Sequence, residues 1–156
     1  MSIVTKFTML LAILAGLSPV VAEDVWFGVW KLNTNTSPKS PNRPQSQVVT
    51  LKSEDGMIAM IEDNVTAKGM QYRVTFKGAL DGKDYPVAGS IAGIELISGT
   101  RLGPDTIELK AKRKDGTVLG TYWVVHSADG RTKITLAWSG PEVAGPPSRV
   151  AIHDRQ

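Results

Sequence analysis

The sequence predicts an all-β protein, a single antiparallel up-and-down barrel of about eight to ten strands. Short segments alternate apolar and polar side chains, as strands with one buried face do. Turn signals such as Asp-Gly separate these segments at hairpin spacing. No window of about 11 residues or more has the apolar repeat of an amphipathic helix. A meander of this many strands removes its exposed edges by closing on itself.

Residues 1–22 resemble a secretory signal peptide. Lys6 supplies a positive start, the segment 9–17 is apolar, and the small residues that end at Ala22 indicate cleavage after that position. The apolar run is shorter than the ~20 residues that a spanning helix needs, so we expect no stable membrane insertion. The chain is therefore predicted to be periplasmic or extracellular. Cleavage would leave residues 23–156, 134 of the 156, as one barrel domain.

The first strand of this domain is expected at 27–32. Alternation places Gly28, Trp30 and Leu32 on the face opposite Val29. Glycine inside a strand usually marks a bend or a close approach by another backbone. A tryptophan two residues later can then fill the closed end of a barrel.

The remaining strands are expected at short intervals. Residues 33–44 contain three prolines and should form a loop, and a second Pro/Gly-rich loop spans 140–147. Asp81-Gly82 is predicted to be a turn, and the glycines of 91–102 suggest bends. The expected strands are 47–52, 57–61, 70–77, 85–87, 106–113, 117–126, 131–139 and 149–154.

Charge and cysteine content limit the classes of partner. Without Lys6 the chain has 17 basic and 15 acidic side chains, a balance that gives no support to a nucleic-acid partner. Lys110, Lys112 and Lys114 alternate on one strand face, which we interpret as solvated. The chain has no cysteine, so an exported form would depend on packing and sheet hydrogen bonds instead of disulfides.

Several of these segments resemble the calycin superfamily, and most closely the small exported bacterial lipocalin-like proteins of uncharacterised function. They are Gly28-Val29-Trp30-Lys31-Leu32-Asn33, Asp81-Gly82-Lys83-Asp84-Tyr85-Pro86-Val87, Gly120-Thr121-Tyr122 and Ser127-Ala128-Asp129-Gly130-Arg131. In calycins the first-strand tryptophan packs against a basic side chain from the last strand. The resemblance implies that Trp30 and Arg149 form this pair here and close the barrel together with Gly28.

No catalytic, metal or cofactor site is predicted. The only two histidines are His126 and His153, and no Gly-x-Ser-x-Gly elbow accompanies them. His153 and Asp154 are neighbours on a strand and should point to opposite faces. Spacings typical of zinc or calcium sites are absent, and haem ligation by His126 is less favoured than a hydrated histidine at a strand end. An enzyme therefore ranks third among the functional hypotheses.

The candidates for ligand binding are side chains that recur on one register of each strand. They are Tyr72, Val74, Phe76, Tyr122, Val124 and Trp138. These side chains either fill the core of a barrel of about eight strands or line a cavity for a small hydrophobic or amphipathic ligand, with tyrosine hydroxyls holding its polar end. Small inward residues such as Ala111 and Gly120 are compatible with either alternative.

Two functional hypotheses from different classes follow. The first is an exported barrel that binds a small hydrophobic ligand in its lumen. The second is a ligand-free interaction or inhibitor-like module that presents the loops 33–44 and 140–147 to another protein. A solvent-accessible lumen favours the first hypothesis, and a solid core favours the second.

Overall fold

The structure, a computed structural model, describes residues 25–156, and every regular element in that range is a strand. The predicted signal peptide lies outside the described residues, and no helix within them is long and apolar enough to cross a membrane. The strands are β1 (Gly28–Leu32), β2 (Ser46–Glu54), β3 (Met57–Val65), β4 (Gln71–Gly78), β5 (Asp81–Ala88), β6 (Leu96–Arg101), β7 (Thr106–Lys112), β8 (Val118–His126), β9 (Thr132–Ser139) and β10 (Arg149–Arg155).

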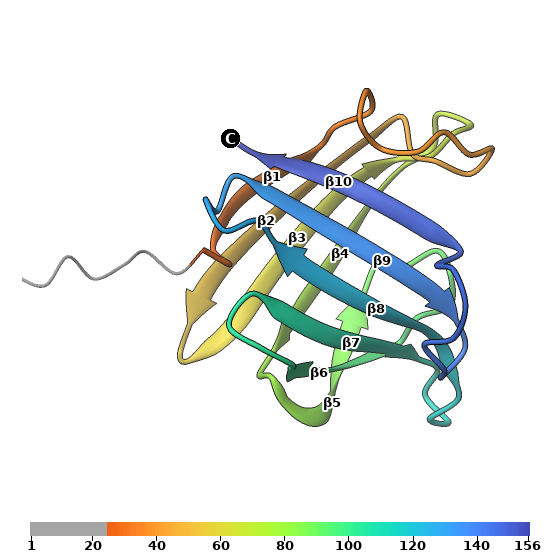
Figure 1. Ribbon diagram of the computed structural model, residues 1–156. Helices are drawn as coiled ribbons and strands as arrows, with labels where there is room; N and C mark the ends of the chain where they lie inside the picture. Colours follow the sequence, from red (N-terminus) through yellow and green to blue (C-terminus); the bar gives the residue numbers. More distant parts are fainter. Residues whose placement is uncertain (1–24) are drawn as a thin grey trace, which may run out of the picture.

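The strands form a closed barrel in which each one pairs with its neighbours in sequence. Every pairing is antiparallel, and β1 closes the ring by pairing with β10 (Figure 1). The predicted up-and-down barrel is therefore confirmed. Closure gives each of the ten strands two neighbours, which limits the exposed edges of an open sheet. The shortest pairing is that of β4 with β5, which pair only at Thr75↔Ala88 and Phe76↔Val87.

The hairpin between β2 and β3 has the predicted Asp-Gly turn. Asp55 and Gly56 both have positive φ, at 53° and 76°. Two central residues with positive φ define the turn whose twist matches that of the flanking strands. The strands it joins pair without interruption from Glu54↔Met57 to Ser46↔Val65.

Asp81-Gly82 is the centre of the reversal from β4 to β5, as predicted, because the pairs Thr75↔Ala88 and Phe76↔Val87 are symmetric about it. The difference is that β5 already begins at Asp81, whereas the strand was expected at 85–87. The register between β5 and β6 shifts between Asp81 and Asp84, as in a bulge. Gly82 has a φ of +79°, which a glycine adopts without steric strain. The same residues thus reverse the chain from β4 and begin the pairing of β5 with β6.

The two ends of the barrel are different. At one end, which we call the tryptophan end, Trp26 and Trp30 are almost fully buried. Trp26 packs with Ile107 and Val124 in the apolar cluster that closes this end. The opposite end, which we call the loop end, has the longer connections, and both Pro-rich loops lie there because β1 and β9 both end there.

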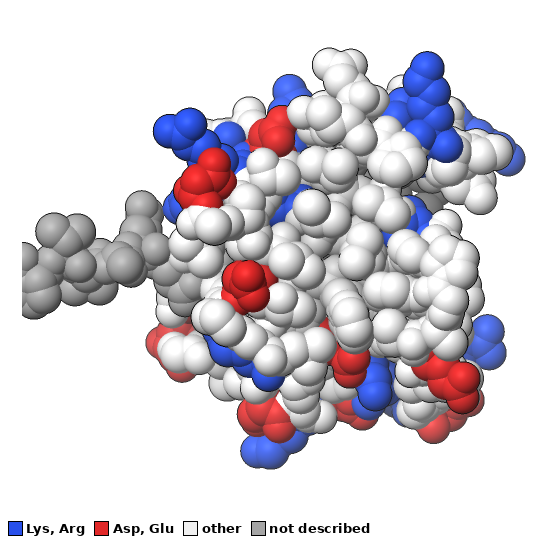
Figure 2. Space-filling view, viewed as in Figure 1, with Lys and Arg blue, Asp and Glu red and all other residues white. Residues whose placement is uncertain are grey.

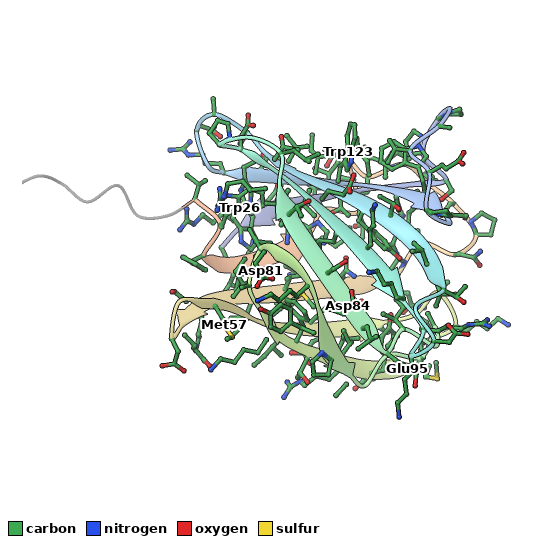
Figure 3. All side chains as sticks on the ribbon, turned by 90° about the horizontal axis from the view of Figure 1, so that it is seen from below. Trp26, Met57, Asp81, Asp84, Glu95 and Trp123 are labelled. Carbon is green, nitrogen blue, oxygen red and sulfur yellow. The ribbon has the colours of Figure 1, made fainter. Side chains whose placement is uncertain are left out.

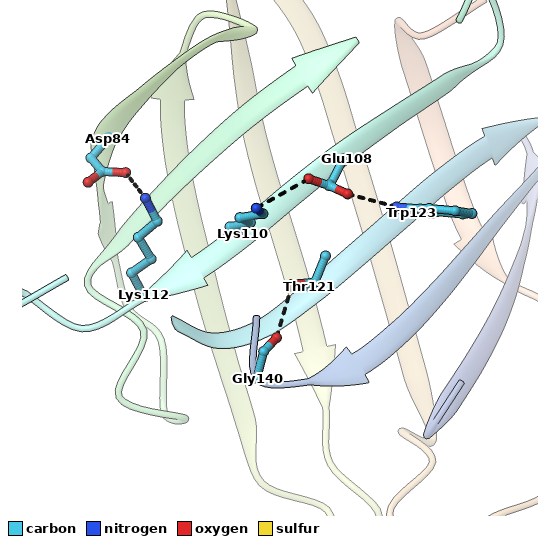
Figure 4. Close-up of polar contacts among 7 residues, drawn as sticks. All are labelled: Asp84, Glu108, Lys110, Lys112, Thr121, Trp123 and Gly140. Atoms are coloured by element: carbon cyan, nitrogen blue, oxygen red, sulfur yellow. Dashed lines mark hydrogen bonds and ion pairs between the residues drawn. The ribbon is translucent and has the colours of Figure 1, made fainter. Parts of the chain in front are cut away.

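The outer surface has charges of both signs. On the face in Figure 2, Lys and Arg are interspersed with Asp and Glu. Figure 4 shows the predicted lysine stripe: Lys112 contacts Asp84 at 2.6 Å, and Lys110 lies 3.6 Å from Glu108. Both lysines lie on the outer side of β7, as the alternation predicted.

Candidate functional site

The barrel encloses a cavity of about 260 Å³. Most of its wall is apolar, and Met60, Phe76 and Leu109 project into it from β3, β4 and β7. The cavity extends to the loop between β5 and β6, where Ile91 lines it and is 53 % exposed. The lumen is therefore hollow and reaches the loop end.

Polar side chains also line the cavity, and the charges of several of them act on one another. We call this group the polar cluster: Glu62, Tyr72, Tyr122, Lys133, Arg149 and His153. The members come from five strands, β3, β4, β8, β9 and β10, so only barrel closure brings them together. A mainly apolar cavity with a few convergent polar groups is the usual form of a small-molecule site.

A chain of hydrogen bonds fixes part of the polar cluster. Glu62 Oε1 accepts hydrogen bonds from Gln47 Nε2 and Asn64 Nδ2, each at 2.8 Å. Because the Gln47 amide nitrogen faces this carboxylate, its Oε1 is the acceptor for His153 Nε2 at 2.7 Å. His153 therefore carries its ring proton on Nε2.

His153 is neutral in this environment. Burial, with the positive charges of Lys133 and Arg149, lowers the pKa of His153 to about 3. Its Nδ1 is buried and has no hydrogen-bond partner among the described residues. The histidine thus adds an acceptor atom to the cluster and no charge.

Lys133 is the most unusual member of the polar cluster. It is only 4 % exposed, and burial lowers the pKa of its amine to about 8, although the charge of Glu62 acts in the opposite direction. Its Nζ lies 5.5 Å from the centre of the Trp30 ring. Among residues 25–156 it makes no hydrogen bond or ion pair. A buried ammonium in this state is costly.

The hydroxyl group of Tyr72 lies within the influence of these charges and of Tyr122. Burial and the nearby charge of Glu62 raise the pKa of Tyr72, with Arg149 acting against them and Tyr122 adding to them. The Tyr72 hydroxyl is therefore protonated at neutral pH and can donate a hydrogen bond.

Five of the six side chains predicted to face the lumen do line the cavity: Tyr72, Val74, Phe76, Tyr122 and Val124. Ala111, predicted to face inward, lines it as well. Alternation of apolar and polar residues predicted the cavity-facing side chains of these strands correctly, because the residues that face inward are mainly the apolar ones.

Trp138 was assigned to the wrong face. The inward residues of β9 are Lys133 and Thr135, so Trp138 points outward. Trp138 is buried on the outer side by two contacts. Its Nε1 donates to Gly145 O in the loop that follows, and its ring packs on that of Trp123 with 5.4 Å between the ring centroids. Trp123 is also on the outer side of the barrel (Figure 3), where its Nε1 donates to Glu108.

Arg149 was assigned to the wrong end of β10. Trp30 pairs with Arg155, whose guanidinium carbon lies 5.6 Å from the centre of the Trp30 ring. In an antiparallel pair the end of one strand meets the start of the other, so the last residue of β10 reaches the tryptophan end. Arg149, the first residue of β10, lies in the polar cluster instead. A Cβ on Gly28 would lie 3.3 Å from Arg155 Nε, which leaves little space for a side chain there.

Sequence reasoning missed Lys133 and Glu62 as residues of the cavity. Both strands alternate as expected. On β9, however, the face with the more polar side chains, which include Lys133 and Thr135, points into the barrel. The loop 140–147 covers the outer side of β9 through the hydrogen bond of Trp138 to Gly145 O. It also contacts β8, where Thr121 Oγ1 donates to Gly140 O (Figure 4). One feature of the sequence could have indicated that the Trp138 face is covered from outside. The Pro/Gly-rich loop 140–147 follows Trp138 almost directly in the sequence.

The structure brings the two Pro-rich loops together. A second hollow of about 190 Å³ lies between them, lined by Pro38, Arg43 and Pro147 among others. Arg43 Nη1 donates to the carbonyls of Thr34 and Ser37, which orders the first loop. No three His, Asp or Glu side chains of residues 25–156 lie together as a metal site would require.

In comparisons with known proteins, no family model, curated protein or solved structure matches this chain. The function proposed below therefore depends on the geometry of the cavity and its polar cluster.

Proposed function

We propose that this chain is an exported barrel that binds a small hydrophobic or amphipathic ligand in its lumen. The observation that carries the proposal is the cavity itself, about 260 Å³ in volume, apolar over most of its wall and lined by a few polar side chains. A cavity of this kind removes an apolar ligand from water, and its few polar groups orient the ligand.

The first test is native mass spectrometry of the protein purified from its own host's envelope. A retained small-molecule adduct supports the proposal and gives the mass of the ligand. Sequencing the N-terminus of the same sample tests export, because removal of residues 1–22 is expected. An unprocessed chain would contradict the exported form.

The second test uses a neutral apolar fluorescent probe such as N-phenylnaphthylamine. We expect saturable binding at one probe per barrel, with a change in tryptophan emission because Trp26 lines the cavity. Ala111→Phe should abolish binding, since this buried side chain also lines the cavity. Ala59→Phe is the matched control: Ile58 and Met60 line the cavity, so Ala59 faces outward.

The outcomes of the probe test separate the alternatives. Binding that survives Ala111→Phe places the probe outside the lumen and contradicts the proposal. Failure of a broad panel of lipids and aromatic compounds to bind the unaltered protein would also contradict it.

The interaction-module hypothesis is the second candidate, favoured by the hollow between the Pro-rich loops. Both loops lie at the loop end, so a partner protein can contact them together. Cross-linking from a photoreactive residue placed at Lys39 in the envelope tests this candidate. A protein adduct that forms with the photoreactive residue at Lys39 would support this candidate. The same residue placed at Lys52, on another part of the surface, should not give that adduct.

Membership of the calycin superfamily is part of the same proposal. It is supported by the meander order of the strands and by a first-strand tryptophan beneath a basic side chain of the last strand.

A further inference from the structure

We propose that the ligand carries a single negatively charged head group, which binds at Lys133, and an apolar body that occupies the Phe76 side of the cavity. This inference rests on the proposed function, because it specifies the chemistry of a ligand in the same lumen.

The first observation is the missing partner of Lys133. Side chains that carry a charge are rarely fully buried unless they are paired. Lys133 is 4 % exposed, lines the cavity and has no hydrogen bond or ion pair within residues 25–156. Its contact with the Trp30 ring, at 5.5 Å, compensates only part of the lost hydration. An anion in the cavity would supply the missing partner.

The second observation is the charge balance of the cavity wall. Its charged side chains at neutral pH are two cations, Lys133 and Arg149, and one carboxylate, Glu62. His153 is uncharged at this pH. Glu62 already accepts two hydrogen bonds from Gln47 and Asn64. Arg149 is exposed to solvent, and the hydrogen bonds of Glu62 come from neutral amides and not from Lys133. Lys133 is therefore the buried cation that a monoanion would balance.

The third observation is the balance of donors and acceptors. Lys133, Tyr72 and Tyr122 bring donor groups to the cavity wall, and none of them makes a side-chain hydrogen bond within residues 25–156. Arg149 also lines the cavity, but its side chain is exposed to solvent. His153, by contrast, uses its N–H on Gln47. Free donors without matching acceptors suit an acidic head group, whose oxygens only accept.

The position of Lys133 defines where the head would lie. His126 on β8 and His153 on β10 pair with it across the sheet, and Glu62 faces it from β3. The guanidinium group of Arg155 and the amine of Lys133 both lie close to the Trp30 ring. The head is thus directed toward the side of the cavity near Trp30, while Phe76, Met60 and Leu109 offer the apolar wall for the body.

The test compares decanoate, decanol and decylamine, which share a chain and differ in head charge. Delipidated protein expressed from its full sequence is titrated at pH 7 below the micelle concentration of each compound. We expect decanoate to bind about tenfold or more tightly than decanol, the effect of one hydrogen bond to a charged group. Decylamine should bind least tightly.

Lys133→Met is the decisive variant, because it removes the charge and keeps much of the side-chain volume. It should abolish the preference for decanoate while retaining decanol binding. Lys110→Met is the matched control, since Lys110 lies on the outer face beside Glu108. It should leave both affinities unchanged.

The outcomes distinguish this inference from the proposed function. Equal binding of decanoate and decanol, or tightest binding of decylamine, overturns the anionic head and leaves the ligand-binding barrel intact. A preference that is lost in Arg149→Met but retained in Lys133→Met also overturns the assignment. If none of the three compounds and no neutral probe binds, the proposed function itself fails.

Discussion

At the scale of single residues, the polar cluster costs stability. Lys133 is held in the barrel with a pKa of about 8 against its usual 10.5, which means that folding disfavours its charged form. His153 is held neutral by the same burial and by neighbouring cations. A core made only of apolar side chains would avoid both costs, so stability does not account for these residues.

The cost at Lys133 can be measured directly. At pH 7 the lysine is charged in both the folded and the unfolded chain, so Lys133→Met should raise the free energy of unfolding by about 2 to 4 kcal/mol. Between pH 8 and 10.5 the unfolded state binds more protons, and the wild type gains stability as the pH rises. The advantage of the variant should therefore shrink across that window. Urea denaturation at pH 7 and pH 10 checks both statements, and an unchanged or lower stability at pH 7 contradicts them.

The histidine predicts a loss of stability in acid. The folded pKa of His153, about 3, lies below its usual 6.5, so the unfolded state binds more protons between these values. The contribution of His153 to the free energy of unfolding should be fully present above pH 6.5. It should decrease as the pH falls, by about 2 to 4 kcal/mol at pH 4. His153→Gln retains a donor for Gln47 and should remove this component.

The comparison is made by urea denaturation of both proteins at pH 7 and pH 4. Four exposed carboxyl groups also have lowered pKa values, owing to hydrogen bonds that include Arg73 for Asp63 and Ser127 for Asp129. They are present in both proteins and cancel in the difference. Equal acid sensitivity of the two proteins would exclude His153 as the source.

At the scale of elements, β1 organises the tryptophan end. Trp30 has no exposed surface, and its ring contacts His126 at 4.7 Å between centroids. Lys133 and Arg155 lie over the same ring at 5.5 and 5.6 Å. One side chain of a five-residue strand thus joins β1 to β8, β9 and β10.

Trp30→Ala should therefore lower the free energy of unfolding by about 3 to 5 kcal/mol, the usual loss for a fully buried aromatic side chain. Trp123→Ala is the control, because Trp123 lies partly exposed on the outside of β8. It should cost about 1 to 2 kcal/mol, as typical substitutions do. Chemical denaturation of the two variants gives the comparison. Similar losses, or a loss under about 1 kcal/mol at Trp30, would mean that this residue does not hold the end closed.

At the scale of the whole molecule, closure depends on the pairing of the first strand with the last. The β1–β10 register joins Trp30 to Arg155 and Leu32 to His153, across most of the described chain. The polar cluster depends on the same closure, since Arg149 and His153 both lie on β10. Contacts this distant in sequence carry a large loop-closure entropy and slow folding.

Deletion of residues 149–156 should consequently prevent folding. It removes β10, exposes the edges of β1 and β9, and opens the cavity along its side. We expect loss of the near-UV circular dichroism signal and association by size-exclusion chromatography. Deletion of Gln156 alone, which removes one backbone hydrogen bond to Val29, should leave a folded monomer. A monomeric, folded product of the longer deletion would show that closure is dispensable.

The sequence by itself determined the strands, most of their turns and the closed meander, because alternation and turn chemistry act between near neighbours. The same local signals placed Tyr72, Phe76 and Tyr122 on the cavity wall, where the apolar set of a strand faces inward. They failed at Trp138 because alternation defines two faces and does not say which of them is covered from outside.

Only the tertiary structure decided the polar cluster and the pairing of Trp30 with Arg155. Both depend on which ends of distant strands meet when the barrel closes, and no local pattern encodes that meeting. The burial of Lys133 arises in the same way: its strand places it inward, between His126 of β8 and His153 of β10 and near the ring of Trp30. A charge is expensive only once it is enclosed, so the cost of Lys133 becomes visible only in the closed barrel.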